Sequence, residues 1–310
     1  MKVLVTGANG FLGKEVVYIL KNNFFDVIST DIVGNVDIVG DLSNKKFVDS
    51  LPLVDVVVNC AAVQYVTKNI PFFCRKKFFY KNNIESAKNL SEKYKDINIF
   101  VHIGTSMMYR QTGQNIYYTD SEMLADGIYS KSKLEAQKYI NNINNQATVI
   151  PCIIGGEGRE GLFKNFIGLM KKFSLVVYPG KGEHKIHMVH VKDVASLIFK
   201  IIETKSKGFF NVAAPEPLSI KEWVDNMQEE MNIKKVRHFK IPLLPISLLS
   251  KLLFYRILAR EQLLMLKFSH VLDISKSLQI GWKPKYTNAE ITREITKSII
   301  EKDRFNANLD

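Results

Sequence analysis

A tyrosine and a lysine at helical spacing are the first residues of this 310-residue chain that suit a catalytic role. Tyr129 and Lys133 are four positions apart, so on a helix they share one face about one turn apart. A tyrosine is a poor base at its ordinary pKa of about 10, and a neighbouring ammonium lowers that pKa by favouring the phenolate. The pair therefore suits proton exchange with a substrate hydroxyl, and a solvated helix face is the alternative interpretation.

A hydroxyl group upstream strengthens the catalytic interpretation. Thr105 and Ser106 follow the apolar run 97–103, which we expect to be a strand. Ligands of an open parallel sheet bind at the carboxyl ends of its strands. We therefore predict that Thr105 hydrogen-bonds a substrate oxygen and shares a proton with Tyr129, with capping of the following turn as the alternative role.

A glycine-rich turn, TGANGFLG, directly follows the first apolar run. Its three glycines suit a tight turn, a close approach of the backbone to a pyrophosphate, and close packing of the next helix on the sheet. They are Gly7, Gly10 and Gly13. The turn predicts a dinucleotide site at the start of the chain.

An acidic residue after the second apolar run selects the cofactor. Asp31 lies 18 residues beyond Gly13, near the spacing expected for a carboxylate that accepts from a ribose 2′-hydroxyl. A carboxylate there repels a 2′-phosphate, and residues 32–40 contain no lysine or arginine. We therefore predict NAD rather than NADP. Asp41 and Leu42 are placed to bracket the adenine, or simply to begin a turn.

The elements that must position these groups follow from the alternation of apolar runs and amphipathic stretches, which is typical of βα units in a parallel sheet. We expect strands at 2–5, 27–30, 54–59, 97–103, 148–153 and 209–212, and a helix opened by a Ser219 and Glu222 capping box. The fold class is α/β, a doubly wound parallel sheet with a smaller, mostly helical substrate lobe. Residues 1–155 and about 188–214 form the sheet domain, and about 156–187 and 215–310 form the lobe.

Composition excludes several classes of protein. Hydrophobic residues make up 46% of the chain, so a sizeable core is available and wholesale disorder is excluded. We expect no membrane-spanning helix, no signal peptide and a cytoplasmic protein. The three cysteines match neither a metal pair nor a disulfide framework, and His184, His187 and His190 would alternate between strand faces, so we predict no metal site.

These motifs together resemble the extended short-chain dehydrogenase/reductases of the NAD-dependent epimerase/dehydratase group. The resemblance implies a Rossmann fold in which Tyr129 is the general base and acid, Lys133 binds the nicotinamide ribose and lowers the pKa of the tyrosine, and Thr105 binds the reacting hydroxyl. It also implies a substrate contact at Ser106. The implied NAD-binding residues are Gly7, Asn9, Gly10, Phe11, Leu12, Gly13, Asp31, Asp41, Leu42, Ala61, Ala62, Asn83, Tyr129, Lys133, Pro151 and Ile154.

The resemblance also narrows the reaction. Sugar dehydratases of this group have Asp and Glu after the catalytic threonine, where this chain has Ser106 and Met107. We therefore expect an NAD-dependent epimerase of a diphosphate-activated sugar, either a nucleotide sugar or a polyprenyl-linked one. A ketone reductase and a non-catalytic NAD-binding regulator remain the alternatives, and a homodimer is expected. The segment 150–156 departs from the family pattern, which leaves the sugar open.

A basic stretch near the C-terminus accounts for much of the formal net charge of +12. Residues 234–270 contain eight lysines and arginines and one acid, Glu261, a net charge of +7. If 248–268 is one helix, Arg256, Arg260 and Lys267 fall within an arc of roughly 40°. We expect a buried leucine-rich face with a basic edge, and peripheral membrane contact through 241–268 is the alternative. We expect no nucleic-acid partner.

Overall fold

The computed structural model describes residues 1–65, 67, 70–114, 116–253 and 259–307. In this part of the chain, seven parallel strands form the central sheet in the order β12-β7-β5-β4-β1-β2-β3. The strands are β1 Lys2–Thr6, β2 Asp26–Asp31, β3 Ile38–Val39, β4 Val56–Asn59, β5 Ile99–Ile103, β7 Gln146–Pro151 and β12 Gly208–Val212. The predicted doubly wound parallel sheet is confirmed.

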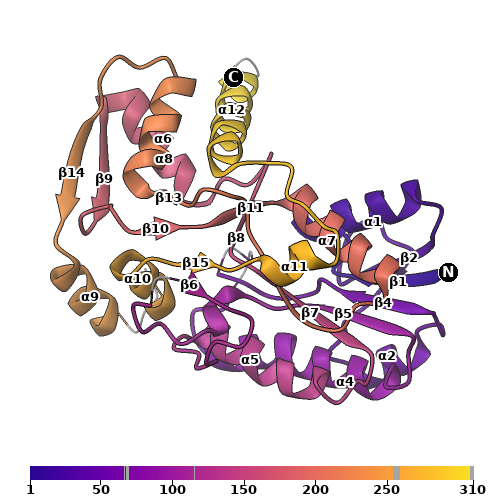
Figure 1. Cartoon of the computed structure of the whole chain (residues 1–310). Helices are drawn as coiled ribbons and strands as arrows, with labels where there is room; N and C mark the ends of the chain where they lie inside the picture. The colour runs from indigo at the N-terminus through magenta and orange to yellow at the C-terminus, as the bar shows by residue number, and fades with distance from the viewer. Residues whose placement is uncertain (66, 68–69, 115, 254–258, 308–310) are drawn as a thin grey trace.

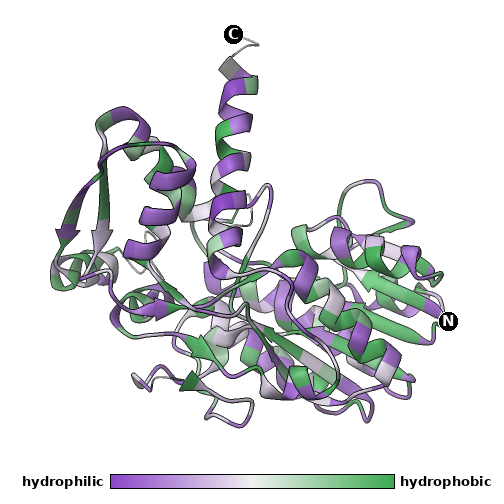
Figure 2. Ribbon diagram, turned by 45° about the horizontal axis from the view of Figure 1, so that its top comes forward, coloured by the Kyte–Doolittle hydropathy of each residue, from purple (hydrophilic) through white to green (hydrophobic). Residues whose placement is uncertain are grey.

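The sheet is buried on both faces, which explains its continuous apolar strands. Every residue of β4 and β5 is buried. Helices α1 Phe11–Asn22 and α7 Val191–Thr204 cover one face, and α2 Lys45–Ser50, α4 Ser86–Lys93 and α5 Ile128–Ile140 lie on the other (Figure 1). The hydropathy colours of Figure 2 show the same arrangement, with hydrophobic strands between helices of mixed character.

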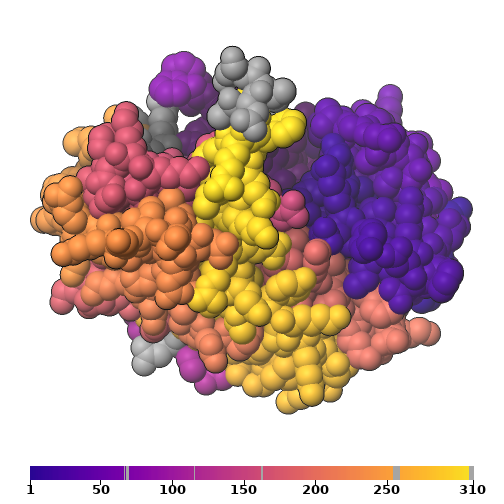
Figure 3. All heavy atoms as spheres, turned by 90° about the horizontal axis from the view of Figure 1, so that it is seen from above, coloured from indigo at the N-terminus to yellow at the C-terminus, as the bar shows by residue number. Residues whose placement is uncertain are grey.

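A second hydrophobic cluster lies outside the sheet. It is built from helices α6 Gly161–Phe173, α8 Ile220–Glu230 and α12 Asn288–Ala307 and from strand β9 Leu175–Pro179. Helix α12 contributes an apolar stripe at four-residue spacing, which packs against α8. Seen from above, α12 runs between the other lobe elements and the N-terminal half of the chain (Figure 3). The predicted capping box is confirmed, since Ser219 and Glu222 exchange hydrogen bonds at the start of α8.

Short elements complete the described chain. They are α3 Arg75–Tyr80, a π-helical segment η1 Lys81–Glu85, a 3₁₀ turn η2 Ser106–Met108, β6 Ile116–Tyr117, β8 Ile153–Gly155, β10 Lys185–Ile186, β11 Met188–His190, β13 Leu218–Ser219, β14 Arg237–Ile241, α9 Leu243–Leu252, α10 Arg260–Lys267, β15 Val271–Leu272 and α11 Ser275–Gln279. The expected strand 148–153 is two strands, because the chain leaves the sheet after Pro151 and β8 pairs with β11 instead.

Residues 248–268, for which a single helix was considered, do not form one. Helix α9 ends at Leu252, α10 begins at Arg260, and Arg256 lies outside the described residues. The expected burial of the leucine-rich face holds in α10, which buries Leu263 and Met265, and is wrong in α9, which exposes most of its leucines. Among the described residues, no helix is long and apolar enough to span a bilayer.

Candidate functional site

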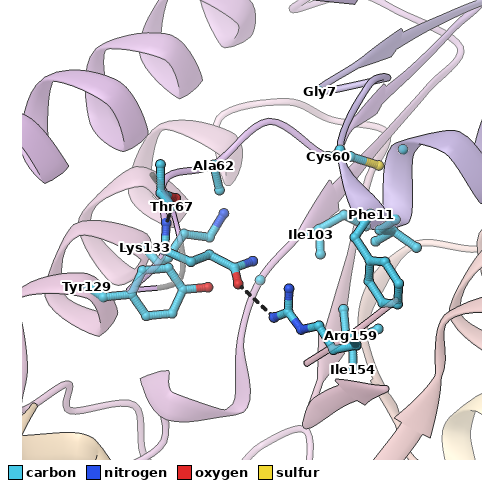
Figure 4. Close-up of a pocket in the computed structure, with 15 residues that line it drawn as sticks. Gly7, Phe11, Cys60, Ala62, Thr67, Ile103, Tyr129, Lys133, Ile154 and Arg159 are labelled. Carbon is cyan, nitrogen blue, oxygen red and sulfur yellow. Dashed lines mark hydrogen bonds between the residues drawn. The ribbon is translucent and has the colours of Figure 1, made fainter. Parts of the chain in front are cut away.

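A cavity of about 450 Å³ opens where the strand order reverses, at the carboxyl ends of β1 and β4. Figure 4 shows that side chains from both halves of the sheet face it. No carboxylate of the described residues lines this cavity. The predicted site residues that line it are Gly7, Gly10, Phe11, Leu12, Gly13, Ala62, Tyr129, Lys133 and Ile154. Asn9, Asp31, Asp41, Leu42, Ala61, Asn83, Thr105, Ser106 and Pro151 lie outside its lining.

The glycine turn has the shape that a dinucleotide requires. Gly7 has a φ of +63°, and a Cβ there would lie 2.7 Å from the backbone of Ala61. Gly10 is the N-cap of α1, and a glycine has no side chain that could cap the first N–H groups of the helix. The first turn of α1 therefore lines the cavity, and its first N–H groups have no side-chain cap. Such a cradle fits a pyrophosphate, which approaches the backbone closely and faces a helix N-terminus.

Asp31 stands beside this turn at the end of β2. Its Oδ2 accepts a hydrogen bond of 2.9 Å from the backbone N–H of Asn9, and its Oδ1 accepts one of 2.7 Å from that of Ile32. The carboxylate therefore has a fixed orientation next to the glycine turn. Each of its oxygens retains a lone pair for a further donor, which fits a ribose hydroxyl.

The other predicted cofactor residues are held by buried or local hydrogen bonds. Asp41 accepts from the backbone and hydroxyl of Ser43, as the turn interpretation predicts. Burial opposes ionisation of Asp41, but Ser43 and the charge of Lys81 outweigh it and lower its pKa. Asn83 exchanges hydrogen bonds with the backbone of Val63 and holds the chain next to Ala62. These residues shape the loops around the cavity.

Tyr129 lies at the start of α5 inside an aromatic cluster. Its side chain is 7% exposed, and the rings of Tyr65 and Phe79 lie 5.7 and 6.3 Å away, centroid to centroid. The hydroxyl of Tyr65 also accepts a hydrogen bond of 3.3 Å from the backbone N–H of Tyr129. The ring is therefore fixed, and its hydroxyl points into the cavity toward Arg159 (Figure 4).

Thr105 and Ser106, the two hydroxyl residues predicted to contact a substrate, have different surroundings in the structure. Thr105 caps the turn η2 by accepting from the backbone N–H of Met107. Its hydroxyl lies near enough to Tyr129 to lower the pKa of that tyrosine. The capping role is therefore present, and the contact with a substrate oxygen stays a prediction. Ser106 is 2% exposed, and its Oγ lies 2.7 Å from Nε2 of His270. The structure thus turns Ser106 away from the cavity, toward the segment before β15.

The expected effect of Lys133 on the tyrosine is corrected by the structure. Burial raises the pKa of Tyr129 to about 12, and the opposing influences are the hydrogen bond with Thr105 and the charge of Arg159. Sequence reasoning considered the neighbouring ammonium and overlooked both burial and Arg159. That guanidinium lines the cavity, donates to Gln64 (3.4 Å) and lies 5.4 Å above the ring of Phe11. Nothing in the local pattern around Arg159 singles it out.

Lys133 ends a buried chain of polar groups. The hydroxyl of Thr6 donates to Asn59 (2.7 Å), Asn59 Nδ2 lies 3.1 Å from His102 Nδ1, and His102 Nε2 lies 3.3 Å from Lys133 Nζ. If Asn59 donates, a neutral His102 carries its proton on Nε2 and donates to a neutral amine. If the side-chain amide of Asn59 is turned over, each hydrogen bond of this series runs in the opposite direction. His102 Nε2 then accepts a hydrogen bond from a charged Lys133. The sequence signal for this series of buried polar groups is a histidine within the apolar run of β5, because a buried polar side chain needs hydrogen-bond partners.

A buried carboxylate anchors the start of α5. Glu261 of α10 is 1% exposed, and its Oε1 accepts from the hydroxyl of Tyr65 (2.7 Å) and the backbone N–H of Ser130 (3.3 Å). A Cβ on Gly127 would meet the carboxylate of Glu261, which would have to shift and loosen these contacts. The next residue, Arg260, pairs with Asp126. The lobe therefore contacts α5 one residue away from Tyr129.

The buried ammonium of Lys133 should lower the free energy of unfolding by a measurable amount. Burial lowers its pKa from 10.5 to about 8. The unfolded chain therefore binds more protons between these values, and the free energy of unfolding should rise as the pH rises through that window. Lys133→Met should raise the free energy of unfolding at pH 7 by about 1 to 3 kcal/mol, because it removes a buried charge.

Urea titrations at pH 7 and pH 9 measure this difference. The advantage of Lys133→Met over the unmodified protein should shrink at the higher pH. Lys131→Met, an exposed position on the same helix, is the matched control and should leave the free energy of unfolding within about 0.5 kcal/mol. A Lys133→Met protein that is less stable at both pH values would show that the buried amine is not a cost.

The doubly wound sheet, the glycine turn at its first strand and the Tyr129 and Lys133 pair beside the same cavity define an extended short-chain dehydrogenase/reductase. The sequence profile of the NAD dependent epimerase/dehydratase family matches residues 3–213. The chain therefore belongs to the NAD dependent epimerase/dehydratase family. NAD is the cofactor of this family, and the glycine cradle described above fits it.

Relatives at low identity extend over most of the chain. A low-salt glycan biosynthesis protein of Haloferax volcanii is 24% identical over 257 residues, covering 74% of this chain and 82% of the relative. The dTDP-4-dehydro-6-deoxyglucose reductase of Escherichia coli is 21% identical over 273 residues, covering 79% and 85%. The structure of UDP-glucose 4-epimerase from Thermotoga maritima with UDP-glucose matches with a TM-score of 0.77 at 19% identity, covering all of both chains.

Proposed function

We propose that the protein is an NAD-dependent epimerase of a diphosphate-activated sugar, which inverts the configuration at C4. The observation that supports this proposal is that Tyr129, Lys133 and the glycine turn line one cavity. Among the described residues, no carboxylate lines that cavity. Oxidation and re-reduction of a hydroxyl need one group that takes and returns a proton. Elimination of water needs a further acid and base, which these lining residues do not include.

Tyr129 is the proposed proton-transfer group. Its hydroxyl takes the proton of the sugar 4-hydroxyl during oxidation and returns it during reduction. Thr105, within hydrogen-bonding reach of that hydroxyl, holds the reacting oxygen. The charge of Arg159 favours the phenolate against the opposing effect of burial. Bound NAD supplies the hydride acceptor and, after the sugar has turned over, the hydride donor.

The cofactor contacts are proposed for the residues around the glycine turn. Its backbone N–H groups bind the pyrophosphate, Asp31 binds the adenosine ribose, and Lys133 binds the nicotinamide ribose. Ala61, Ala62, Asn83, Asp41 and Leu42 shape the adenine side of the cavity, while Pro151 and Ile154 lie on the nicotinamide side. The supporting observation is the fixed carboxylate of Asp31 beside a helix N-terminus that has no side-chain cap.

A phosphorylated substrate is proposed from the charge of the cavity. Lys133 and Arg159 both line it, and the carboxylate nearest to Tyr129, that of Glu261, is buried behind the tyrosine and is absent from the lining. An anion entering this space therefore meets two cations and no lining carboxylate. A diphosphate linked to a nucleoside or to a polyprenyl group has this chemistry.

Proton NMR of the purified protein with a panel of sugars tests the function. UDP-, dTDP- and GDP-sugars and polyprenyl-diphosphate sugars are each incubated with catalytic NAD, and inversion at C4 of at least one is expected. In a parallel incubation with NADH and keto-sugars, stoichiometric loss of NADH absorbance without inversion would identify a ketone reductase instead. Tight NAD binding without turnover of any substrate would favour a regulator and contradict the proposal.

Asp31→Asn tests the cofactor assignment. The neutral amide no longer repels a 2′-phosphate and is a weaker acceptor for a ribose hydroxyl, because charged hydrogen bonds are the stronger ones. The ratio of NADP to NAD dissociation constants should fall at least about tenfold, as measured by calorimetry with each cofactor.

Asp26→Asn is the matched control for this substitution. Asp26 is exposed at the opposite end of the same strand, and its replacement should leave both dissociation constants within about twofold. An unchanged cofactor ratio in Asp31→Asn would exclude Asp31 as the ribose-binding residue.

A further inference from the structure

Among the described residues, exposed hydrophobic side chains are concentrated on strand β14 and helix α9, at the outer end of the lobe (Figure 1). We call this region the leucine surface. Its large hydrophobic side chains are 40 to 75% exposed. They are Phe239, Ile241, Leu244, Leu248, Leu249, Leu252 and Leu253. Monomeric proteins rarely leave so many neighbouring hydrophobic side chains in water without a binding partner.

The leucines of α9 form a stripe. Leu244, Leu248 and Leu252 are spaced four residues apart, so they stand one above another along one side of the helix. Leu249 extends the stripe sideways, while the buried position of α9 is the polar Ser250. The half-buried positions of α9 are also apolar, Leu243 and Ile246, so the helix is hydrophobic on its inner and its outer side. A helix that only packs on a core has a polar outer side. The outer leucines of α9 therefore suit an apolar environment outside the lobe.

Strand β14 adds exposed hydrophobic side chains directly before α9. Phe239 and Ile241 alternate with Lys240, so their side chains point to one side of the strand. Pro242 then leads directly from the strand into α9. The exposed aromatic and aliphatic groups of the strand and the leucine stripe of the helix thus belong to one connected piece of chain.

The charged side chains of the segment that forms the leucine surface are all positive, although Glu183 of the neighbouring segment lies near enough to Lys240 to feel its charge. Residues 231–252 contain no aspartate or glutamate. Within the described residues, none of their cations lies within 4 Å of a carboxylate oxygen. These cations are Lys234, Lys235, Arg237, Lys240 and Lys251.

Charge decides between two occupants of this surface. A second copy packed symmetrically on it would place two sets of five cations, none of them in a salt bridge within the described residues, against each other. An anionic lipid surface instead offers phosphate oxygens to the basic groups and acyl chains to the leucines. We propose that the leucine surface binds to the interface of an anionic bilayer, with α9 lying in the plane of the headgroups. This inference does not depend on the identity of the sugar.

Vesicle flotation of the full-length, NAD-loaded protein tests the proposal without any turnover. Vesicles of phosphatidylcholine with about 30 mol% phosphatidylglycerol should carry the protein, and vesicles of phosphatidylcholine alone should carry much less. About 0.5 M NaCl should weaken the binding, because it screens the basic groups. Leu248→Glu and Lys240→Glu should each reduce the bound fraction at least about tenfold.

Leu53→Glu is the matched control. Leu53 is 81% exposed and precedes β4 in the sheet domain, so the same substitution there should leave vesicle binding unchanged. Thermal melting and NAD binding confirm that each variant is folded. The proposal is overturned if the unmodified protein does not bind anionic vesicles, or if Leu53→Glu weakens binding as much as Leu248→Glu. A dimer that Leu248→Glu dissociates, without vesicle binding, would assign the surface to a second copy.

Discussion

Replacement of Tyr129 by phenylalanine is expected to slow turnover of the sugar about 10²- to 10⁴-fold, the range typical of a lost general acid and base. The variant keeps the ring, and therefore its contacts with Tyr65 and Phe79. The hydroxyl it removes interacts with Thr105 in the cavity. NAD affinity should change by less than about threefold and the melting temperature should stay within a few degrees, because the packing around the ring is retained.

Steady-state kinetics with the best sugar of the NMR panel measure this effect. The loss should appear in kcat, since the hydroxyl acts on the reacting proton rather than on substrate binding alone. Tyr139→Phe, at a half-buried position on the same helix, is the control and should retain full activity. If Tyr129→Phe keeps more than about a tenth of the activity, another group transfers the proton.

A methyl group on Gly13 is expected to destroy the cofactor site. Its Cβ would lie 2.0 Å from the carbonyl oxygen of Gly7 and 2.8 Å from Cα of Ala8. Both obstacles are backbone, so α1 must move away from β1 and carry its N-terminal N–H groups with it. We expect Gly13→Ala to lower the free energy of unfolding by about 3 kcal/mol or more, and the affinity for NAD at least about 100-fold.

Gly168→Ala is the matched control, with an effect of opposite sign. Gly168 is exposed in the middle of α6, and nothing lies within 4 Å of an added Cβ. Alanine is the better helix former by about 1 kcal/mol, so this variant should be slightly more stable. Urea unfolding and calorimetry with NAD measure both variants. Gly13→Ala with unchanged NAD affinity would show that the close approach of α1 to the turn is not needed.

The features that depend on residues near one another in the sequence were predicted correctly. The glycine turn, Asp31 at the end of its strand, and the pairing of Tyr129 with Lys133 depend on local spacing along a strand or a helix. The parallel sheet follows from apolar runs separated by amphipathic stretches. The two-residue strand β3 was not predicted, because so short a run has no measurable period.

The residues that sequence reasoning missed act across long separations in the chain. Arg159 reaches the cavity from a glycine-rich loop without periodicity. Glu261 had a signal, as the single acid of a basic stretch, but its role requires a contact with Ser130, 131 residues away. Sequence spacing gives no measure of such contacts. The direction of the pKa of Tyr129 was missed for the same reason, since burial is a property of the folded chain.

The sequence by itself determined the class of fold, the position of the dinucleotide turn and the candidate proton-transfer pair, because periodicity and glycine placement are local properties of the backbone. The tertiary structure decided which charges reach the cavity, that Ser106 turns away from it toward His270, and that the leucines of α9 face outward. Helix periodicity shows that α9 has an apolar side, but it does not show whether another part of the chain covers that side. Only the packed fold answers that question.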